Sequence, residues 1–326
     1  MMVIAYVGNF EARTPSGELF STESHLSASL EQLGHTVVRL QENRVTAEQV
    51  AFRVRECAAD LFLWTKTGEW LRGDREEMLR VIKCPTVAYH LDLYAGLPRS
   101  ANVDSEPWWR CKYVFTADGG SDDFWREHRI NHYWAPPGVY GKECYLAEPG
   151  PERYDVIFVG SGKNGYHPEW PYRKQLLDWL ANTYGERFVL FGRGGELECV
   201  RGAALNQLYA SAKVVVGDSL CLGFQHRRYW SDRVPETLGR GGFLIHPAVS
   251  GLEQFFRNRE HLVTYDYGDF DGLKQTIDYY LAHDEERETI RLVGHEEVKS
   301  RHTYANRMAW MLETVRRSET RVDVML

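Results

Sequence analysis

Two side chains of opposite charge, Arg233 and Glu236, lie three residues apart within residues 230–245. This segment has the pattern of a helix with Ser231 as its N-cap, followed by a glycine turn and a buried strand. The three-residue spacing places both side chains on one face of the helix. A carboxylate can accept hydrogen bonds from two vicinal hydroxyls, and a guanidinium can bind phosphate. The pattern is equally consistent with an ion pair inside the helix.

A second candidate site is the glycine-rich turn at residues 160–165, which follows a predicted strand. Backbone N–H groups in such a turn, and at a helix N-terminus, can hold phosphate. The residue order is not that of a Walker loop, and Gly165 falls one place late for a dinucleotide-binding G-x-G-x-x-G turn. We therefore expect contacts to a diphosphate or a sugar. The candidates are Gly160, Ser161, Lys163 and Arg173, the last two being equally consistent with surface charges.

Residues 230–245, followed by 250–253, resemble the nucleotide-sugar-binding signature of glycosyltransferases with two Rossmann-like domains, the GT-B type. They are most similar to the group 1 enzymes related to the spore maturation protein CgeB, whose pattern is approximately S-D-R-x-x-E-x-L-x-x-G-G-F. The resemblance covers most of residues 155–312. The first half of the chain resembles the family only in general layout.

The resemblance implies roles for several residues. Glu236 would accept hydrogen bonds from the ribose of a nucleotide-sugar, most often a UDP-sugar, and Arg233 would reach its diphosphate. The turn at Gly192 and Arg193 resembles the family's second glycine turn, which lies against the base or the diphosphate. Enzymes of this type use helix N-termini and cationic side chains at the leaving diphosphate. We therefore expect no metal and no cofactor, the nucleotide-sugar being a co-substrate.

The sequence departs from the wider superfamily at Arg228. Retaining members often carry a glutamate at the position eight before the ribose-binding one, where this chain has Arg228. The stereochemical outcome therefore stays open. Arg228 either adds positive charge near the diphosphate or belongs to a solvated basic loop.

In the first half of the chain, the candidate residues follow two predicted strands. His90 and Asp92 come after residues 85–89 and would project to the same side if that strand continued. In an inverting transfer either could be the general base, and in a retaining transfer one would bind the donor sugar. They are also consistent with a structural polar pair. Asn9 and Phe10 follow the first strand and are expected to contact the acceptor.

The elements that would position these residues alternate between strand and helix. Strands are predicted at residues 3–7, 36–40, 60–64, 85–89, 113–116, 154–159, 187–191, 213–216, 242–246 and 262–265. Helices are predicted at residues 21–33, 172–184, 231–238, 270–282 and 303–317. This alternation predicts an α/β fold with two doubly wound parallel sheets, facing one another across a cleft. Ligands of such folds bind at the carboxyl ends of the strands.

A stretch rich in proline and glycine, residues 135–151, separates the two halves. Such a composition is typical of a linker, so the boundary is predicted near residue 150. Residues 1–150 would form the acceptor-side domain, and residues 151–303 the nucleotide-sugar-binding domain. The final helix, within residues 304–326, has an apolar face that either returns to the first domain or packs on the second.

The composition is that of an ordinary globular protein, with 43% hydrophobic and 26% charged residues. The net charge of −7 provides no global attraction for nucleic acid, although Arg99, Arg110 and Lys112 could form a local basic patch. The six cysteines include no C-x-x-C pair, which argues against a zinc site. The apolar runs are too short for a signal peptide or a membrane span, so a cytoplasmic location is expected.

The sequence therefore predicts a hexosyl or pentosyl transferase that acts on an acceptor hydroxyl. A glycan, a metabolite, a protein and a modified DNA base all stay open as acceptors. One competing class is a Rossmann-type NAD-dependent enzyme, which the missing G-x-G-x-x-G turn disfavours. Another is a two-domain protein that binds a nucleotide or another small molecule without chemistry.

Overall fold

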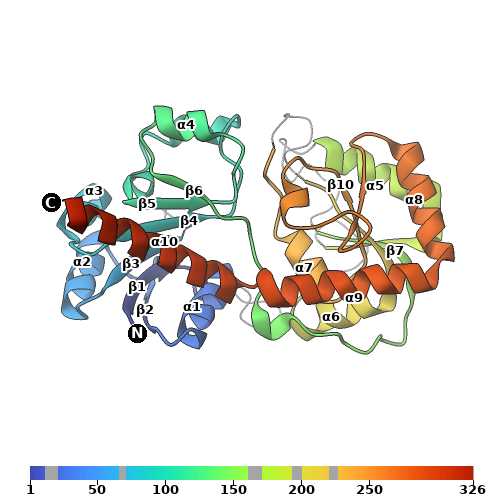
Figure 1. The fold of residues 1–326 in the computed structure, drawn as a ribbon, viewed down its shortest axis with the longest axis horizontal. Helices are drawn as coiled ribbons and strands as arrows, with labels where there is room; N and C mark the ends of the chain where they lie inside the picture. Colours follow the sequence, from blue (N-terminus) through green and yellow to red (C-terminus); the bar gives the residue numbers. More distant parts are fainter. Residues whose placement is uncertain (12–20, 66–70, 161–170, 193–199, 220–226, 326) are drawn as a thin grey trace. The chain divides into compact units, whose positions relative to one another are not determined.

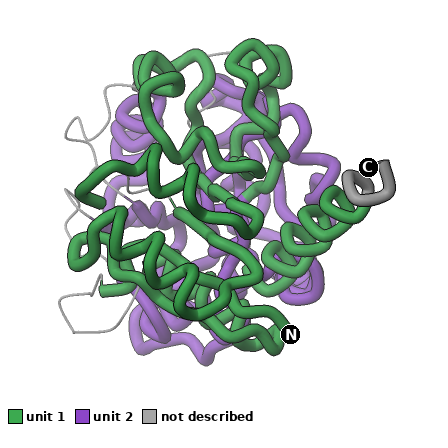
Figure 2. The backbone as a smooth tube through the Cα atoms, turned by 90° about the vertical axis from the view of Figure 1, so that its left-hand side faces the viewer, with its two compact units in different colours: residues 1–136, 304–326 green, residues 137–303 purple. Residues whose placement is uncertain are grey.

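The chain forms two compact units, each with its own parallel sheet (Figure 1). The computed structural model describes residues 1–11, 21–65, 71–160, 171–192, 200–219 and 227–325. Unit 1 consists of residues 1–136 and 304–326, and unit 2 consists of residues 137–303. The first and last segments of the chain therefore belong to the same unit, which Figure 2 shows in green.

Unit 1 is built on a six-stranded sheet with the order β2-β1-β3-β4-β5-β6, in which the paired strands run parallel. Strands β3, β4 and β5 are buried along their whole length, as expected when helices cover both faces of a parallel sheet. The strands are β1 (Val3–Gly8), β2 (Thr36–Gln41), β3 (Leu61–Thr65), β4 (Thr86–His90), β5 (Tyr113–Thr116) and β6 (His132–Trp134).

The helices of unit 1 begin at residues that the sequence marks clearly. Ser21, Thr46 and Asp74 are N-caps whose side chains accept a hydrogen bond from a backbone N–H of the first turn. Gln49 completes a capping box with Thr46. The helices are α1 (Thr22–Gln32), α2 (Ala47–Glu56), α3 (Arg75–Val81), α4 (Asp122–Glu127) and α10 (Tyr304–Met325), with short 3₁₀ turns η1 (Pro98–Asn102) and η2 (Pro107–Arg110).

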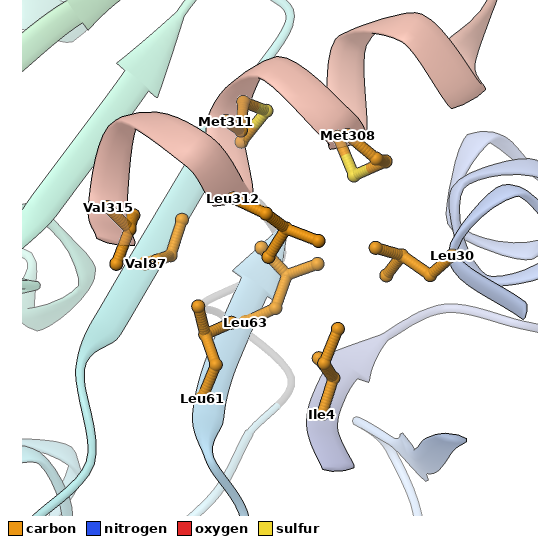
Figure 3. Close-up of a pocket in the computed structure, with 9 residues that line it drawn as sticks. All are labelled: Ile4, Leu30, Leu61, Leu63, Val87, Met308, Met311, Leu312 and Val315. Carbon is orange, nitrogen blue, oxygen red and sulfur yellow. The ribbon is translucent and has the colours of Figure 1, made fainter. Parts of the chain in front are cut away.

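Helix α10 packs on unit 1, where it closes one face of the sheet beside α1 (Figure 3). Met308, Met311 and Val315 are buried, and together with Leu312 they line a small apolar cavity over β1, β3 and β4. An ion pair between Lys112 and Glu319 at 2.7 Å ties the same helix to the start of β5. Of the two packings that the sequence left open, this structure therefore shows the return to the first unit.

Unit 2 is built on a five-stranded parallel sheet with the order β11-β10-β9-β7-β8. Its strands are β7 (Tyr154–Val159), β8 (Phe188–Phe191), β9 (Ala212–Val216), β10 (Leu244–Pro247) and β11 (Val263–Tyr265). Its helices are α5 (Pro171–Tyr184), α6 (Gly202–Ser211), α7 (Arg233–Gly239), α8 (Phe270–Ala282) and α9 (Asp284–Arg301), with 3₁₀ turns η3 (Gly141–Glu143), η4 (Gly185–Arg187) and η5 (Leu252–Gln254).

Every strand predicted from the sequence overlaps an observed strand, and the two doubly wound parallel sheets are confirmed. Strand β6 was not predicted, because it has only three half-buried residues and no clear pattern.

The predicted N-cap of α7 was wrong: the helix begins at Arg233, with Asp232 at the N-cap position. The Ser231 carbonyl accepts the Val234 N–H at 3.3 Å, but its Oγ atom caps no described backbone N–H.

The sequence placed the domain boundary near residue 150, whereas backbone contacts divide the chain after Pro136. Residues 137–150 belong to unit 2 because hydrogen bonds hold them to α6. The Asn206 side chain donates to the carbonyls of Glu143 and Tyr145, at 2.8 and 2.9 Å, and the Gly150 N–H donates to Ser211 Oγ at 2.8 Å. Within the part of the chain that the structure describes, no helix is long and apolar enough to cross a membrane.

The packing of α10 gives a test of the fold. Met311 is 3% exposed, so Met311→Ala should lower the free energy of unfolding by about 2–5 kcal/mol through lost burial and a larger cavity. Arg317→Ala, on the exposed side of the same helix, should change it by less than about 0.5 kcal/mol. Urea unfolding followed by tryptophan fluorescence measures both. Equal effects of the two substitutions would contradict this packing.

Candidate functional site

The sheet of unit 2 changes its winding direction between β7 and β9. The chain leaves β7 toward β8 on one side and then returns to β9 on the other side. In doubly wound sheets, the crevice outside the carboxyl ends of such a strand pair is where ligands bind. Here these ends are Gly160, after β7, and Asp218, after β9. The candidate site of unit 2 is therefore expected around these two residues.

Asp218 lies between two arginines at this edge of the sheet. Arg173, from the first turn of α5, donates from Nε to Asp218 Oδ2 at 2.6 Å and from Nη2 to Oδ1 at 3.2 Å. Arg233, the first residue of α7, pairs with Asp218 Oδ1 and donates from Nε to the carbonyl of Val159 at 3.0 Å. Both guanidinium groups also lie near the ring of Phe158, on β7. We call Arg173, Asp218 and Arg233 the arginine–aspartate cluster.

The arginine–aspartate cluster keeps an ionised carboxylate in a buried position. Burial by itself would raise the pKa of Asp218, but the charges of Arg233 and Arg173 outweigh this effect and hold its pKa below the ordinary value. Asp218 is 3% exposed, Arg173 is 8% exposed and the Arg233 side chain is 11% exposed. Two guanidinium groups and one carboxylate leave one net positive charge. This edge of unit 2 is therefore suited to an anion.

Two glycines let the backbones approach one another at this edge. Gly192, after β8, has a φ of 136°, and a Cβ there would lie 2.1 Å from the carbonyl oxygen of Gly160. A Cβ at Gly160 would lie 2.6 Å from Arg233 Nη2. Any larger side chain at either position would therefore push the turns after β7 and β8 apart or displace Arg233. Both of these glycines, predicted as donor-binding residues, lie beside the arginine–aspartate cluster.

Glu236 and Arg233 do not pair with each other, so the ion pair considered from their spacing is not formed. Glu236 Oε2 instead accepts from Arg240 Nε at 2.5 Å, one turn further along the chain. Arg240 is 3% exposed and also pairs with Glu143, while its Nη1 donates to Asn206 Oδ1 at 2.7 Å. Arg240 therefore fixes the direction of the Glu236 side chain.

Ser231 and Arg228 lie just before α7. The Ser231 Oγ atom is buried and has no hydrogen-bond partner among the described residues. Arg228 has a φ of 56°, and its N–H donates to the carbonyl of Ser250 at 2.6 Å. A Cβ at Gly251 would lie 2.5 Å from Arg228 Cγ, which explains a glycine at that position. The structure therefore holds the backbone of Arg228 in a fixed turn near the start of α7.

The predicted pair His90 and Asp92 lies in unit 1 and does not share one environment. Strand β4 ends at His90, so the strand alternation does not extend to Asp92. His90 is 1% exposed, and its ring centroid lies 3.7 Å from that of Trp108 and 5.1 Å from that of Trp109. The Asp92 side chain is 44% exposed and lies 3.6 Å from Arg99. Of the two, only Asp92 is open to a ligand in this structure.

Asn9 and Phe10 follow β1 and are joined to the end of β2. Gln41 donates from Nε2 to Asn9 Oδ1 at 3.2 Å and accepts the Phe10 N–H at 2.8 Å. The Phe10 carbonyl accepts from Ser24 Oγ at 3.1 Å, at the start of α1. These contacts place both residues at the carboxyl edge of the unit 1 sheet.

Three of the predicted site residues, Ser161, Lys163 and Arg193, lie outside the described residues. Among the residues that are described, no group of three or more His, Cys, Asp or Glu side chains is placed to hold a metal ion. The suggested basic patch of unit 1 carries little net charge, because each cation has an acidic partner. Arg99 lies near Asp92, Arg110 pairs with Asp104 at 3.0 Å, and Lys112 pairs with Glu319.

The segment that carries the arginine–aspartate cluster and Glu236 matches a known family. Residues 173–313 match the glycosyl transferase-like family. This glycosyl transferase-like segment includes Arg173, Asp218, Arg233 and Glu236, that is, most of the candidate site of unit 2. No curated protein sequence matches the chain at a significant level.

Solved structures match the whole chain. A sucrose-phosphate synthase from Thermosynechococcus elongatus is 13% identical with a TM-score of 0.66, and the match covers 98% of this chain and 100% of that one. HepE from Anabaena in complex with UDP and glucose is 12% identical with a TM-score of 0.61, covering 97% and 99%. An alpha-glucosyltransferase in complex with UDP is 10% identical with a TM-score of 0.71, covering 97% and 100%. The fold is therefore the GT-B fold.

The sequence did not indicate two residues of this site. Asp218 follows β9 in the run Gly217-Asp218-Ser219, and its position after a predicted buried strand was the available signal. Arg240 lies four residues after Glu236, which is pairing distance on a helix. Because the helix was predicted to end at residue 238, Arg240 was not considered as a partner of Glu236.

The arginine–aspartate cluster predicts that Asp218 is required for stability. Asp218→Asn removes the only negative charge of the cluster, with which two buried guanidinium groups pair. The free energy of unfolding should therefore fall by about 3–5 kcal/mol. Asp178→Asn, which removes an exposed partner of Lys174 on α5, should lower it by less than about 1 kcal/mol. Urea unfolding of both variants tests this, and equal losses would count against a buried cluster.

Proposed function

We propose that this protein is a glycosyltransferase that moves a sugar from a nucleoside-diphosphate sugar to an acceptor hydroxyl, without a metal ion. One observation carries the proposal. A cluster with one net positive charge lies at the winding switch of unit 2, and a carboxylate lies one helical turn away, within the segment that matches the glycosyl transferase-like family. A cation for a diphosphate and a carboxylate for a ribose are the two groups that such a donor requires.

The arginine–aspartate cluster supports a role at the leaving diphosphate. In glycosyl transfer, the bond from the anomeric carbon to a diphosphate oxygen breaks, and its electron pair stays on that oxygen. The acceptor oxygen forms the new bond to carbon and releases its proton. Guanidinium groups already fixed near the developing charge stabilise it without reorganisation. Arg173 and Arg233 are fixed in this way by Asp218, and Arg233 also by the Val159 carbonyl. The metal-independent part of the proposal rests on these two cations.

Glu236 is the group proposed to bind the ribose. Arg240 engages its Oε2 atom, whereas no described residue donates to Oε1. A carboxylate oriented through one oxygen can accept from ribose hydroxyls through the other. Glu236 also follows Arg233 by one turn of α7, which is the spacing of the arginine and the glutamate in the S-D-R-x-x-E pattern that this segment resembles.

A UDP-hexose is the donor that the comparisons favour. HepE was solved with UDP and glucose, and also with UDP-glucose, and the alpha-glucosyltransferase was solved with UDP. We propose the same class of donor here, and a place among the CgeB-like group 1 enzymes because of the residues around Glu236. A modified DNA base is a second candidate acceptor, because the alpha-glucosyltransferase was also solved with DNA. The paired cations of unit 1 and the net charge of −7 disfavour it.

Nucleotide binding tests the proposal. UDP should raise the melting temperature of the protein, and NAD should not, since a ligand stabilises only the fold that binds it. Glu236→Gln and Arg233→Ala should each weaken UDP binding about tenfold or more in calorimetry, through loss of a charge-assisted hydrogen bond. Glu296→Gln, at an exposed position of α9, is the matched control and should leave the affinity unchanged.

Release of UDP from UDP-glucose, followed over time, then distinguishes a transferase from a binding protein. Binding of UDP without any turnover would leave only the binding function. UDP affinity that did not respond to Glu236→Gln and Arg233→Ala would contradict the proposed site.

A further inference from the structure

The sheet of unit 1 has its own winding switch, between β1 and β3. The chain leaves β1 toward β2 on one side and returns to β3 on the other. By the rule used for unit 2, a ligand is expected outside the carboxyl ends of β1 and β3. Gly8 ends β1 and Thr65 ends β3, and two carboxyl side chains, Glu23 and Glu42, lie at this edge. None of these four residues was singled out by the sequence.

Glu42 is a buried carboxyl group that no described residue satisfies. It follows β2 directly, and its backbone N–H donates to the carbonyl of Gly8 at 3.2 Å. The residue is 0% exposed, yet both side-chain oxygens lack a hydrogen-bond partner among the described residues. Leaving a buried polar group unpaired is costly to a fold, so such a group calls for a specific explanation. A ligand that hydrogen-bonds to Glu42 supplies one.

Glu23 lies beside Glu42 and over the end of β1. A Cβ at Gly8 would be 2.7 Å from Glu23 Cγ and 2.9 Å from Thr65 Oγ1, so a glycine is needed for this approach. Thr65 Oγ1 donates to Glu23 Oε1 at 3.5 Å, and Tyr6 donates from its hydroxyl to Thr65 Oγ1 at 3.3 Å. Glu23 is only partly buried, so one member of the pair is exposed to solvent in part.

The charge state of these groups narrows the class of ligand. Burial, followed by the nearby charge of Glu23, raises the pKa of Glu42 to about 8, and burial raises the pKa of Glu23 as well. At neutral pH, Glu42 is therefore mostly a neutral acid, which both donates and accepts hydrogen bonds. The hydroxyls of Tyr6 and Thr65 do the same. A sugar hydroxyl matches this set, whereas an ammonium group only donates and an anion only accepts.

We propose that Glu42 and Glu23 form the acceptor subsite of this enzyme and bind the hydroxyl groups of a neutral sugar. The inference rests on the proposed glycosyl transfer, for which it names the acceptor class. Unit 2 would bind the anionic donor through fixed cations, and unit 1 the uncharged acceptor through carboxyl and hydroxyl groups. Asn9 and Phe10, which share this edge of the sheet, would border the subsite.

Ligand-observed saturation-transfer NMR on the full chain tests the subsite, with D-glucose, D-mannose and N-acetylglucosamine as probes. The sugar with the strongest signal is then titrated against the variants. Glu42→Leu should weaken its binding about tenfold or more, because hydrogen bonds to both oxygens are lost. Glu42→Gln should weaken it less than about threefold, because an amide also donates and accepts. Glu56→Gln, an exposed position of α2, should have no effect.

Three results would overturn the subsite. They are an unchanged affinity in Glu42→Leu, a loss in Glu42→Gln as large as that in Glu42→Leu, and no binding of any of the three sugars by the wild-type protein. UDP binding, measured on the same samples, separates this inference from the proposed function. If UDP binds and one of these results is found, only the subsite fails. If UDP does not bind, the proposed function fails. Should Glu42→Leu not fold, Glu23→Ala replaces it with the same expected loss.

Stability as a function of pH checks the state of Glu42 independently of any ligand. A carboxyl whose pKa is higher in the folded chain than its ordinary value of 4.5 makes folding less favourable as pH rises from that value toward about 8. The wild-type melting temperature should therefore fall between pH 5 and pH 8, with Glu23 and Tyr6 as the other titratable groups nearby. Glu42→Leu should make this fall shallower. If the slope of melting temperature against pH did not change in Glu42→Leu, Glu42 would not be a neutral acid, and the proposed subsite would be contradicted.

Discussion

The salt bridges of Asp218 to Arg173 and Arg233 are the interaction on which the candidate donor site depends. Asp218 follows β9, Arg173 belongs to the first turn of α5 and Arg233 begins α7, so one carboxylate positions the starts of two helices at one edge of the sheet. A buried ion pair adds little net stability, because desolvation of the charges offsets much of their attraction. The ion pairs of Asp218 matter here because they fix the positions of the two guanidinium groups. Two cations are held in place before an anion arrives, and one positive charge is left over for that anion.

In both sheets, a ligand is expected at the winding switch, but the side chains at the two switches differ in chemistry. In unit 2, the winding switch between β7 and β9 carries guanidinium groups, and two glycines let the neighbouring turns approach closely. In unit 1, the switch between β1 and β3 carries carboxyl and hydroxyl groups over Gly8, with a carboxyl that no described residue satisfies. Cations suit a charged diphosphate, and carboxyl and hydroxyl groups suit sugar hydroxyls. The difference between the switches therefore matches the difference in charge between the proposed donor and the proposed acceptor.

Much of the fold could be predicted from the sequence, because parallel strands buried on both faces have continuous apolar runs such as Leu61–Thr65. The positions of Gly160 and Glu236 followed from the same alternation and from the family resemblance. Pairings between elements could not be predicted. That Arg233 contacts Asp218 and not Glu236, and that tryptophans cover His90, depends on side chains distant in sequence. The pairing of Arg240 with Glu236 was missed for another reason, because the predicted helix ended before Arg240. Glu42 looked like an ordinary polar residue at a strand end, and only its burial distinguishes it.

A crystal structure of the protein with UDP would show directly whether the arginine–aspartate cluster and Glu236 bind the nucleotide. We expect diphosphate oxygens within hydrogen-bonding distance of the guanidinium groups of Arg173 and Arg233, and ribose hydroxyls hydrogen-bonded to the Oε1 atom of Glu236. A nucleotide bound elsewhere, with no phosphate on either arginine and with Glu236 turned away from the ribose, would contradict it.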